Sequence, residues 1–482
     1  MKKELIILLI FIIIVFLLNY DCDREDFTPV EALTKFNDIK STVELTKKVD
    51  TIFRKHNITY WMIGGTLLGA VRNKGMISWD DDADIAILDN MVEKLNSIKD
   101  ELSSEGLGLV PAFFGYKIFN LNGRVIKEYD FKYPFLDVFV TVRDEDKIIL
   151  RDQGARNMWP KEIYDYSKTF PLKEWEYEDF KLWGPNDPIP LLDTIYTDWK
   201  TKGVKPKFEH TTHDQGEYYE FELLPSSNKP YIWLYWDNVN TNKTPDYIIL
   251  CRETVKKNCS RNFNIIELNK DNIDKWLPEL KDFKKSIDPL IIAHKVDIYR
   301  IMLLYKYGGI YLDSDIIVMK DLSDIVHKLK KYDFVGFGCS FEECKNGYGK
   351  PSNWLLASRP NTRLMGMILK YQLEKIKNKI EYHDIGKNAI WHVMDQLIKE
   401  EDYQYYQYDC TYDGTRDING KWITSDMVFS NKTIEYDNER NFLVYVFYNT
   451  GMDDNIKKMT RNELLNKKWN FTKYLKKSLK LN

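Results

Sequence analysis

The chain has 482 residues, which is enough for two or three domains that each bury a full core. Hydrophobic residues make up 44% of the chain and charged residues 30%, a composition that excludes a wholly disordered protein. The formal net charge of -3 indicates no large basic face in the body of the chain, so we expect no nucleic-acid partner.

An unbroken apolar run from Leu5 to Leu18 follows the positively charged start Met-Lys-Lys-Glu. The run is short for a bilayer span, which usually takes about 20 residues. Its positive start and apolar core nevertheless suit a secretory signal or a signal anchor. Because no small-residue cleavage site follows, we favour an uncleaved membrane anchor over residues 1–20, with a cleaved signal as the alternative. The body of the protein would then be lumenal or extracytoplasmic.

The polar, acidic segment 21–41 predicts a stalk. Two α/β-like segments follow over residues 42–215 and 229–482, and the turn-forming residues between them predict a linker over 216–228. Just before this linker, His210 and His213 stand at a loose metal-ligand spacing. No further ligand lies nearby in the sequence, so we expect no metal there.

The six cysteines include no Cys-x-x-Cys pair, so zinc and thioredoxin-like chemistry are not expected. Cys339 and Cys344 are close enough for a local disulfide if the body is lumenal, and structural free thiols are the alternative.

A glycine-rich string from Thr59 to Arg72 predicts a short strand, a Gly-Gly turn and the start of a helix. Gly64 and Gly65 would let backbone N–H groups approach a phosphate closely, and a helix N-terminus favours an anion. We therefore predict that Gly64, Gly65, Thr66 and Arg72 bind the donor of a transferred group.

Aspartates follow in two places. Asp80, Asp82 and Asp84 alternate, so their side chains would project from one side of an extended strand. Asp137 is the single carboxylate of the apolar strand Phe135-Leu-Asp-Val-Phe-Val, and such a residue requires a partner. Asp82, Asp84 and Asp137 together predict a metal site for two-metal phosphoryl transfer. Asp137 could also take the proton from an attacking hydroxyl.

These strings resemble the LicD/fukutin family of nucleotidyltransferase-fold phosphotransferases. The resemblance covers about Val43 to Lys207 and is carried by Gly-Gly-Thr-Leu-Leu-Gly-Ala-Val-Arg, Ile-Ser-Trp-Asp-Asp-Asp-Ala-Asp-Ile and Leu-Asp-Val-Phe. It implies a nucleotidyltransferase-like α+β domain that moves phosphocholine or a polyol phosphate from a CDP-linked donor onto a glycan. Thr197 departs from the family pattern, which has glycine in this turn.

In the second half, apolar residues at helical spacing predict a helix over residues 291–306, ended by Gly308 and Gly309. The string from Ile310 to Met319 then reads as one buried strand that contains Asp313 and Asp315. Residues two apart in a strand share a face, so these carboxylates would converge on one point. Two adjacent carboxylates on an apolar strand require a cation. Oxygen ligands suit Mg²⁺ or Mn²⁺, which would neutralise a diphosphate leaving group.

The preceding helix carries Asp297 and Arg300, three residues apart and therefore on one face. The Arg300 guanidinium could reach a phosphate or a sugar hydroxyl, and Asp297 could accept sugar hydroxyls.

The string from His294 to Asp315 resembles the D-x-x-R…Y-G-G-x-Y-x-D-x-D signature of DXD-type sugar transferases, a group with capsular polysaccharide synthesis proteins, Och-type mannosyltransferases and glucosylating toxins. Lys229-Pro-Tyr-Ile-Trp-Leu-Tyr-Trp-Asp-Asn resembles the opening strand of the capsular branch. The resemblance implies a GT-A (Rossmann-like) fold, a nucleotide-sugar donor and a retaining outcome. It also implies that Trp233 lies near the nucleotide, Tyr311 near the base or ribose, and Asp297 and Arg300 near the sugar. Core packing is the alternative for Trp233 and Tyr311.

The sequence thus predicts a membrane-anchored, bifunctional α/β enzyme that builds glycans with Mn²⁺ or Mg²⁺. One site would transfer a sugar and the other a phosphate-linked substituent, onto one class of glycan or glycoconjugate acceptor. Asp137, Asp313 and Asp315 are the predicted catalytic residues. The alternatives are a single-activity glycosyltransferase whose N-terminal domain holds the acceptor, and a glycan-binding surface protein without activity.

Overall fold

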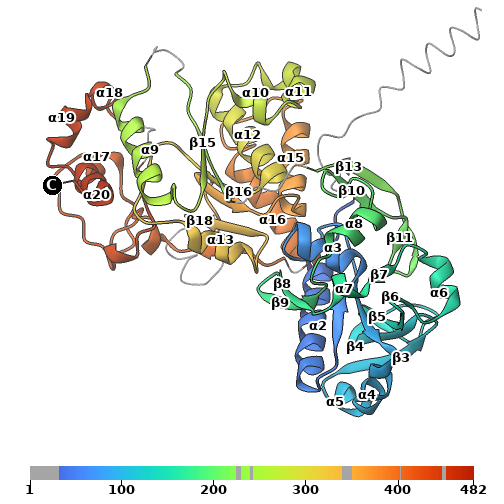
Figure 1. Ribbon diagram of the computed structural model, residues 1–482. Helices are drawn as coiled ribbons and strands as arrows, with labels where there is room; N and C mark the ends of the chain where they lie inside the picture. Colours follow the sequence, from blue (N-terminus) through green and yellow to red (C-terminus); the bar gives the residue numbers. More distant parts are fainter. Residues whose placement is uncertain are drawn as a thin grey trace, which may run out of the picture.

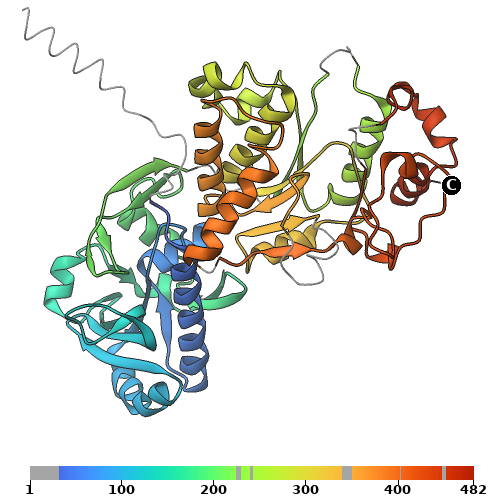
Figure 2. The ribbon, with the colours of Figure 1, turned by 180° about the vertical axis from the view of Figure 1, so that it is seen from behind.

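The computed structural model describes residues 32–223, 229–238, 243–338, 350–401, 403–447 and 452–481. The predicted anchor over residues 1–20 lies outside these ranges, as do Cys339 and Cys344. In the part of the chain that is described, we find no helix with the length and apolarity needed to cross a membrane. The chain is mixed α/β and forms two lobes that lie side by side (Figures 1 and 2).

The N-terminal lobe is built on a seven-stranded sheet in the order β1-β2-β5-β4-β3, with β6 and β7 added at β5. Its elements are α2 (Phe36–Lys55), β1 (Tyr60–Met62), α3 (Gly64–Arg72), β2 (Ala83–Leu88), η2 (Asp89–Met91), α4 (Val92–Ser97), α5 (Lys99–Ser104), β3 (Leu107–Ala112), β4 (Gly115–Val125), β5 (Lys132–Asp144), β6 (Lys147–Leu150), α6 (Gln153–Met158), β7 (Ile163–Asp165), α7 (Tyr166–Thr169), β8 (Lys173–Tyr177), β9 (Phe180–Gly184), α8 (Ile189–Ile195), β10 (Lys202–Lys205), β11 (Phe208–Glu209), β12 (Asp214–Gln215) and β13 (Tyr219–Glu222).

The central pair of this sheet brings the predicted aspartates together. β2 and β5 run parallel, and Asp84 pairs directly with Asp137 in their register. The residues around Asp137 in β5 are buried, as the apolar string predicted. Strand residues opposite each other project from the same face, so the pairing places both carboxylates on one side of the sheet.

The predicted stalk over residues 21–41 is wrong for its described part. α2 begins at Phe36, and Ala32, Leu33 and Phe36 are buried in the core. Apolar residues continue along α2 at helical spacing, including Leu45 and Val49, and a helix with such a stripe folds onto the core. The predicted linker over 216–228 is likewise partly a strand, because β13 pairs with β10.

The C-terminal lobe contains a six-stranded sheet in the order β15-β14-β16-β19-β18-β20. Its elements are β14 (Tyr231–Tyr235), α9 (Asp246–Cys259), β15 (Asn264–Leu268), α10 (Ile273–Trp276), α11 (Leu280–Ile287), α12 (Ile292–Tyr307), β16 (Gly309–Leu312), β17 (Ile316–Val318), α13 (Ser323–Leu329), β18 (Phe334–Phe337), β19 (Leu355–Ser358), α15 (Arg363–Lys375), α16 (Lys387–Glu401), β20 (Tyr406–Tyr408), η3 (Cys410–Tyr412), α17 (Ser425–Val428), η4 (Glu439–Asn441), β21 (Val444–Val446), α18 (Asp454–Lys458), α19 (Arg461–Leu465) and α20 (Asn470–Leu479).

The predicted helix ahead of the Asp313–Asp315 pair is confirmed as α12. It ends at Gly308, whose φ of 65° is followed by a φ of 96° at Gly309. A Cβ atom at Gly309 would lie 2.5 Å from the carbonyl oxygen of Tyr231, so the turn requires glycine there for space as well as for backbone conformation.

The predicted single strand from Ile310 to Met319 is wrong. β16 ends at Leu312, and the chain turns through Ser314 before β17 begins. β17 leaves the main sheet and pairs with β21 instead. The physical reason is the cost of placing two carboxylates inside an otherwise apolar sheet. The turn moves both out of the sheet, and the Ser314 hydroxyl anchors it by donating to the backbone oxygen of Tyr235 at 3.0 Å.

The two lobes share a hydrophobic core that includes residues from both. At the junction, where α16 lies close to the start of α2 in Figure 2, the Phe36 and Tyr403 rings pack 4.9 Å apart. Arg359 of the C-terminal lobe also donates from Nη1 to Oε2 of Glu178, in the β8–β9 turn, at 2.8 Å. An apolar contact and an ion pair therefore both connect the two lobes.

Candidate active sites

A cavity of about 700 Å³ opens in the N-terminal lobe beside the β2–β5 pair. Its acidic wall is formed by Asp80, Asp82, Asp84 and Asp137. The lining also includes five aromatic residues, Trp79, Trp159, Tyr196, Trp199 and Tyr218. The cavity therefore joins a carboxylate cluster to an apolar surface, as a site for a donor molecule with a charged and an uncharged end requires.

Three of these aspartates lie close enough to share a cation. Asp82, Asp84 and Asp137 each offer an oxygen atom, and these atoms lie within 4.8 Å of one another. Burial raises the pKa of all three carboxyls, that of Asp137 to about 6. Buried carboxylates at such spacing are stable in their charged form when a cation neutralises them, and the all-oxygen set fits Mg²⁺ or Mn²⁺.

Gly64 and Gly65 begin α3 directly against the aspartates. Gly64 has a φ of 54°, and a Cβ atom there would lie 2.9 Å from Oδ2 of Asp84. At Gly65 a Cβ atom would lie 2.3 Å from Oδ2 of Asp80. The absence of side chains thus lets the positive end of the helix approach the carboxylates themselves.

Thr66 and Arg72 differ in their relation to the cavity. Thr66 is buried and its hydroxyl accepts the backbone N–H of Asp84 at 2.8 Å, so it positions an aspartate and does not line the cavity. This corrects its predicted contact with the donor. Arg72 does line the cavity, where Nη1 donates to the backbone oxygen of Trp199 at 2.9 Å and the guanidinium lies 5.3 Å from the Trp79 ring centre.

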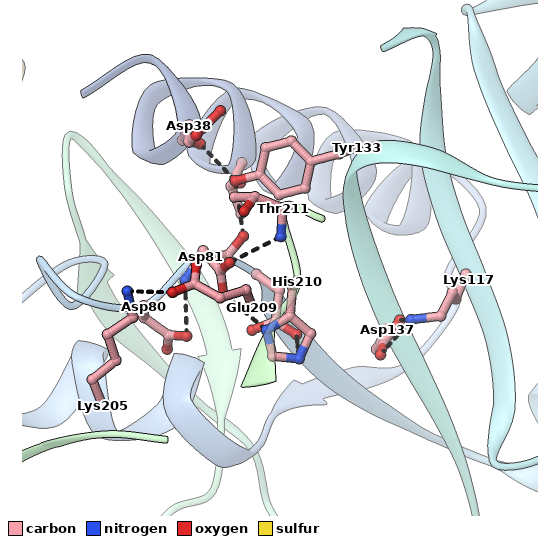
Figure 3. A network of polar contacts seen from close by, with 12 residues as sticks. Asp38, Asp80, Asp81, Lys117, Tyr133, Asp137, Lys205, Glu209, His210 and Thr211 are labelled. Atoms are coloured by element: carbon pink, nitrogen blue, oxygen red, sulfur yellow. Dashed lines mark hydrogen bonds and ion pairs between the residues drawn. The ribbon is translucent and has the colours of Figure 1, made fainter. Parts of the chain in front are cut away.

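Lys117 is a residue of this site that the sequence analysis missed. Its Nζ atom donates to both oxygens of Asp137, at 2.6 and 2.9 Å, and both side chains are buried (Figure 3). The Phe135 ring centre lies 3.8 Å from the same atom. Lys117 carried the same kind of signal that identified Asp137. It is the single charged residue in the otherwise apolar string Phe-Gly-Tyr-Lys-Ile-Phe at the start of β4.

From the sequence we expect no metal at His210, but the fold places two carboxylates beside it. Nδ1 of His210 lies 2.8 Å from Oδ1 of Asp81 (Figure 3). Nε2 lies 3.2 Å from Oδ2 of Asp82. The fold therefore supplies His210 with neighbouring ligands from a distant part of the chain. His213, its neighbour in sequence, instead packs against the Tyr129 ring at 4.1 Å.

A second cavity, of about 620 Å³, lies in the C-terminal lobe. It is lined by the predicted residues Asp297, Arg300, Tyr311, Asp313 and Asp315. Burial raises the pKa of Asp313 to about 6 and that of Asp315 to about 7. The charge of Asp313 contributes to the raised pKa of Asp315, and both residues line the cavity, so they remain close together despite the break in the predicted strand.

Arg300 links the helix to the carboxylates. Its guanidinium nitrogens lie 3.3 Å from Oδ1 of Asp297 and 3.3 Å from Oδ1 of Asp313, and the group lies 4.7 Å from the Tyr311 ring centre. The Tyr311 hydroxyl is buried and has no hydrogen-bond partner among the residues that the structure describes. Nδ2 of Asn353, a residue missed in the sequence, donates to Oδ1 of Asp297 at 2.9 Å.

Two oxygen ligands fit a divalent ion that completes its shell with phosphates and water. Within the ranges that the structure describes, no third Asp, Glu, His or Cys joins Asp313 and Asp315 in a cluster of potential ligands. The sequence likewise shows no third ligand.

Trp233 requires a correction. The resemblance placed it near the nucleotide, but its side chain is fully buried and stacks on Tyr231 at 4.7 Å. Its ring nitrogen donates to the backbone oxygen of Gly308 at 2.9 Å, which leaves no polar group for a ligand. β14 directs Trp233 into the core, whereas Trp236, just after the strand, lines the cavity.

Comparison with known proteins agrees with this division into two sites. Residues 57–187 match the family described as LicD/FKTN/FKRP, nucleotidyltransferase domain. Residues 197–464 match the family described as capsular polysaccharide synthesis protein. The second match covers more than half of the chain, and the protein belongs to the capsular polysaccharide synthesis protein family.

Individual relatives resemble parts of the chain. An uncharacterised protein of Rickettsia prowazekii is 31% identical over 33% of this chain and 55% of its own length, so the chain spans about half of that relative. The lipopolysaccharide cholinephosphotransferase LicD of Haemophilus influenzae is 23% identical over 35% of this chain and 78% of its own length. An uncharacterised glycosyltransferase of Acanthamoeba polyphaga mimivirus is 34% identical over 21% of this chain and 36% of its own length.

Proposed function

We propose that the protein is a bifunctional transferase that builds a glycan with two metal-dependent sites. The C-terminal domain, with a GT-A fold, transfers a sugar from a nucleotide sugar with retention of configuration. The N-terminal domain transfers a phosphate-linked substituent, such as phosphocholine or a polyol phosphate, from a CDP-linked donor. The observation that carries the proposal is the presence of two separate cavities, each lined by its own group of aspartates.

In the C-terminal site, Asp313 and Asp315 would hold Mn²⁺ or Mg²⁺, which would supply positive charge for a diphosphate leaving group. Arg300 is held between Asp297 and Asp313, so its planar guanidinium is oriented before the donor enters. Oδ1 of Asp297 contacts Arg300 and accepts a hydrogen bond from Asn353, which orients the carboxylate. Oδ2 of Asp297 is then the oxygen that accepts sugar hydroxyls.

In the N-terminal site, Asp82, Asp84 and Asp137 would hold the metal, which would neutralise the charge of the transferred phosphate. Asp137 accepts the proton of the attacking glycan hydroxyl. Its pKa near 6 leaves it mostly charged at neutral pH, and Lys117 keeps its carboxylate in one orientation. The aromatic wall of the cavity excludes water from the donor.

A donor screen tests this proposal. The purified chain is incubated with UDP-, GDP- and CDP-linked compounds, with Mn²⁺, Mg²⁺ or a chelator, and release of nucleotide is measured. The proposal expects metal-dependent turnover of at least one nucleotide sugar and of at least one CDP-linked donor. Turnover of nucleotide sugars alone contradicts the proposed phosphotransferase activity. If no donor is turned over, the proposal that the protein is an enzyme is contradicted.

The location of the reaction is part of the proposal. The apolar run from Leu5 to Leu18 supports a membrane-anchored protein whose catalytic body is lumenal or extracytoplasmic, where a growing glycan is accessible. Protease digestion of intact and opened cells tests it, since an external body is cleaved in both.

A further inference from the structure

The hairpin β11–β12 carries His210 into the N-terminal site. β11 and β12 pair antiparallel, and residues 210–213 form the connection between them. This hairpin lies outside residues 57–187, the part of the chain that matches the nucleotidyltransferase family. Nothing in that match assigns a role to His210, although its imidazole is among the groups that line the cavity.

The imidazole of His210 is held in a single orientation. Oδ1 of Asp81 lies 2.8 Å from Nδ1, and Oδ2 of the same carboxylate accepts the backbone N–H of Thr211 at 3.0 Å. The centre of the Phe208 ring, in β11, lies 4.9 Å from the centre of the imidazole ring. A carboxylate that fixes Nδ1–H leaves Nε2 as the nitrogen available to a ligand, as in carboxylate–histidine–metal arrangements.

Nε2 faces the aspartate that already belongs to the predicted metal site. It lies 3.2 Å from Oδ2 of Asp82. Two ligand atoms bound to one ion at about 2.1 Å and at right angles lie about 3.0 Å apart, so this distance is the one expected for neighbouring ligands of a single cation. Asp82 is thereby common to two groups of potential ligands, one with Asp84 and Asp137 and the other with Asp81 and His210.

The charge around this position also favours a cation. Asp80 and Asp82 are close enough to form a hydrogen bond with each other, and Asp80, Asp81 and Asp82 all act on His210. Carboxylates this close in a buried cavity repel one another unless a proton or a metal ion lies among them.

We propose that His210 is a direct ligand, through Nε2, of a second cation position in the N-terminal site, with Asp82 shared between the two positions and Asp81 orienting the imidazole. This inference rests on the proposed phosphotransfer function of that site. The β11–β12 hairpin thereby contributes a nitrogen ligand to the metal site of the N-terminal domain. A nitrogen ligand favours Mn²⁺ over Mg²⁺ at this position.

A proton competes with the cation for the same place. Burial lowers the pKa of His210, but the charges of Asp82 and Asp81 outweigh it and raise the pKa to about 10. In the absence of metal the imidazolium itself therefore bridges the two carboxylates. If the imidazole stayed protonated in the presence of metal, His210 would act only as a fixed positive charge. Electron paramagnetic resonance distinguishes this outcome from coordination.

Pulsed electron paramagnetic resonance with Mn²⁺ alone provides the test, since it detects the ¹⁴N nucleus of a coordinated imidazole and needs neither donor nor acceptor. The protein is the full chain with Asp313→Asn and Asp315→Asn, which removes the metal ligands of the C-terminal site. His210→Gln is compared with His213→Gln, a control on the same hairpin whose ring lies against Tyr129.

We expect a ¹⁴N coupling in the parent chain and in His213→Gln, and its loss in His210→Gln, with Mn²⁺ affinity lower by at least about 10-fold. Bound Mn²⁺ without ¹⁴N coupling in the parent chain, or an unchanged coupling in His210→Gln, overturns the inference and leaves the proposed function intact. A parent chain that binds no Mn²⁺ overturns both. The parent spectrum decides the question even if His210→Gln does not fold.

Discussion

Lys117 offers the most quantitative test of how the N-terminal site balances its charges. Its ammonium and the Asp137 carboxylate are each about 9% exposed and are joined by two hydrogen bonds of 2.6 and 2.9 Å. Lys117→Met preserves most of the volume and the contact with the Phe135 ring but removes the charge. Asp137 then remains buried without its cation.

Breaking a buried ion pair by removing one partner costs about 3–5 kcal/mol, since the remaining charge stays desolvated. We therefore expect Lys117→Met to destabilise the metal-free chain by about this amount at pH 7.5. The loss should be smaller near pH 5.5, because burial already raises the pKa of Asp137 to about 6 and a protonated carboxyl needs no cation. Saturating Mn²⁺ should also reduce the loss, because the metal then supplies the missing charge.

Urea unfolding of the wild type and of Lys117→Met, with Mn²⁺ or with chelator, measures both effects. Lys127→Met, at an exposed lysine in the same lobe, is the control and should change little. A loss that is the same with and without Mn²⁺ would show that Asp137 does not face the metal, and the reasoning would be refuted. A loss below about 1 kcal/mol would show that the ion pair is not buried in solution.

Three further predictions follow from the contacts of the C-terminal lobe. Arg300→Lys loses the planar fork between two carboxylates and should lower kcat/KM for nucleotide-sugar hydrolysis about 10–100-fold; unchanged kinetics would contradict its role. Asp313 and Asp315 bind protons more tightly in the folded than in the unfolded chain, so metal-free stability should fall as pH rises from about 5 to 7, and less steeply when both are Asn. Arg359→Leu leaves Glu178 without its partner and should lower the urea midpoint, with partial recovery in Arg359→Leu/Glu178→Gln.

Short-range patterns were sufficient to predict several elements. The apolar spacing before Gly308 gave α12 nearly to the residue, because helix periodicity and a glycine end are local properties. Asp137, the one carboxylate of the apolar string Phe135–Val140 in β5, indicated a partner, and the structure provides it in Lys117, while the register of β2 with β5 places Asp84 beside it. An isolated charge in an apolar strand is informative because its burial must be compensated somewhere.

Contacts between distant segments were beyond the sequence. His210 meets Asp81 across 129 positions, and no periodic signal connects a hairpin tip to a strand so far away. Lys117 carried a local signal, but which carboxylate it pairs with depends on the order of β4 and β5 in the sheet. Trp233 and Trp236 show the same limit, since the end of β14 decides which tryptophan is buried and which reaches the cavity.

The central claim is that the two aspartate clusters serve two different reactions, and comparison of Asp82→Asn with Asp313→Asn on the same donors tests it most directly. Asp144→Asn and Asp282→Asn, at exposed positions in the same two lobes, serve as controls. The account predicts that Asp82→Asn loses turnover of the CDP-linked donor and keeps that of the nucleotide sugar, and that Asp313→Asn does the reverse. Loss of the same activity in both variants would contradict it.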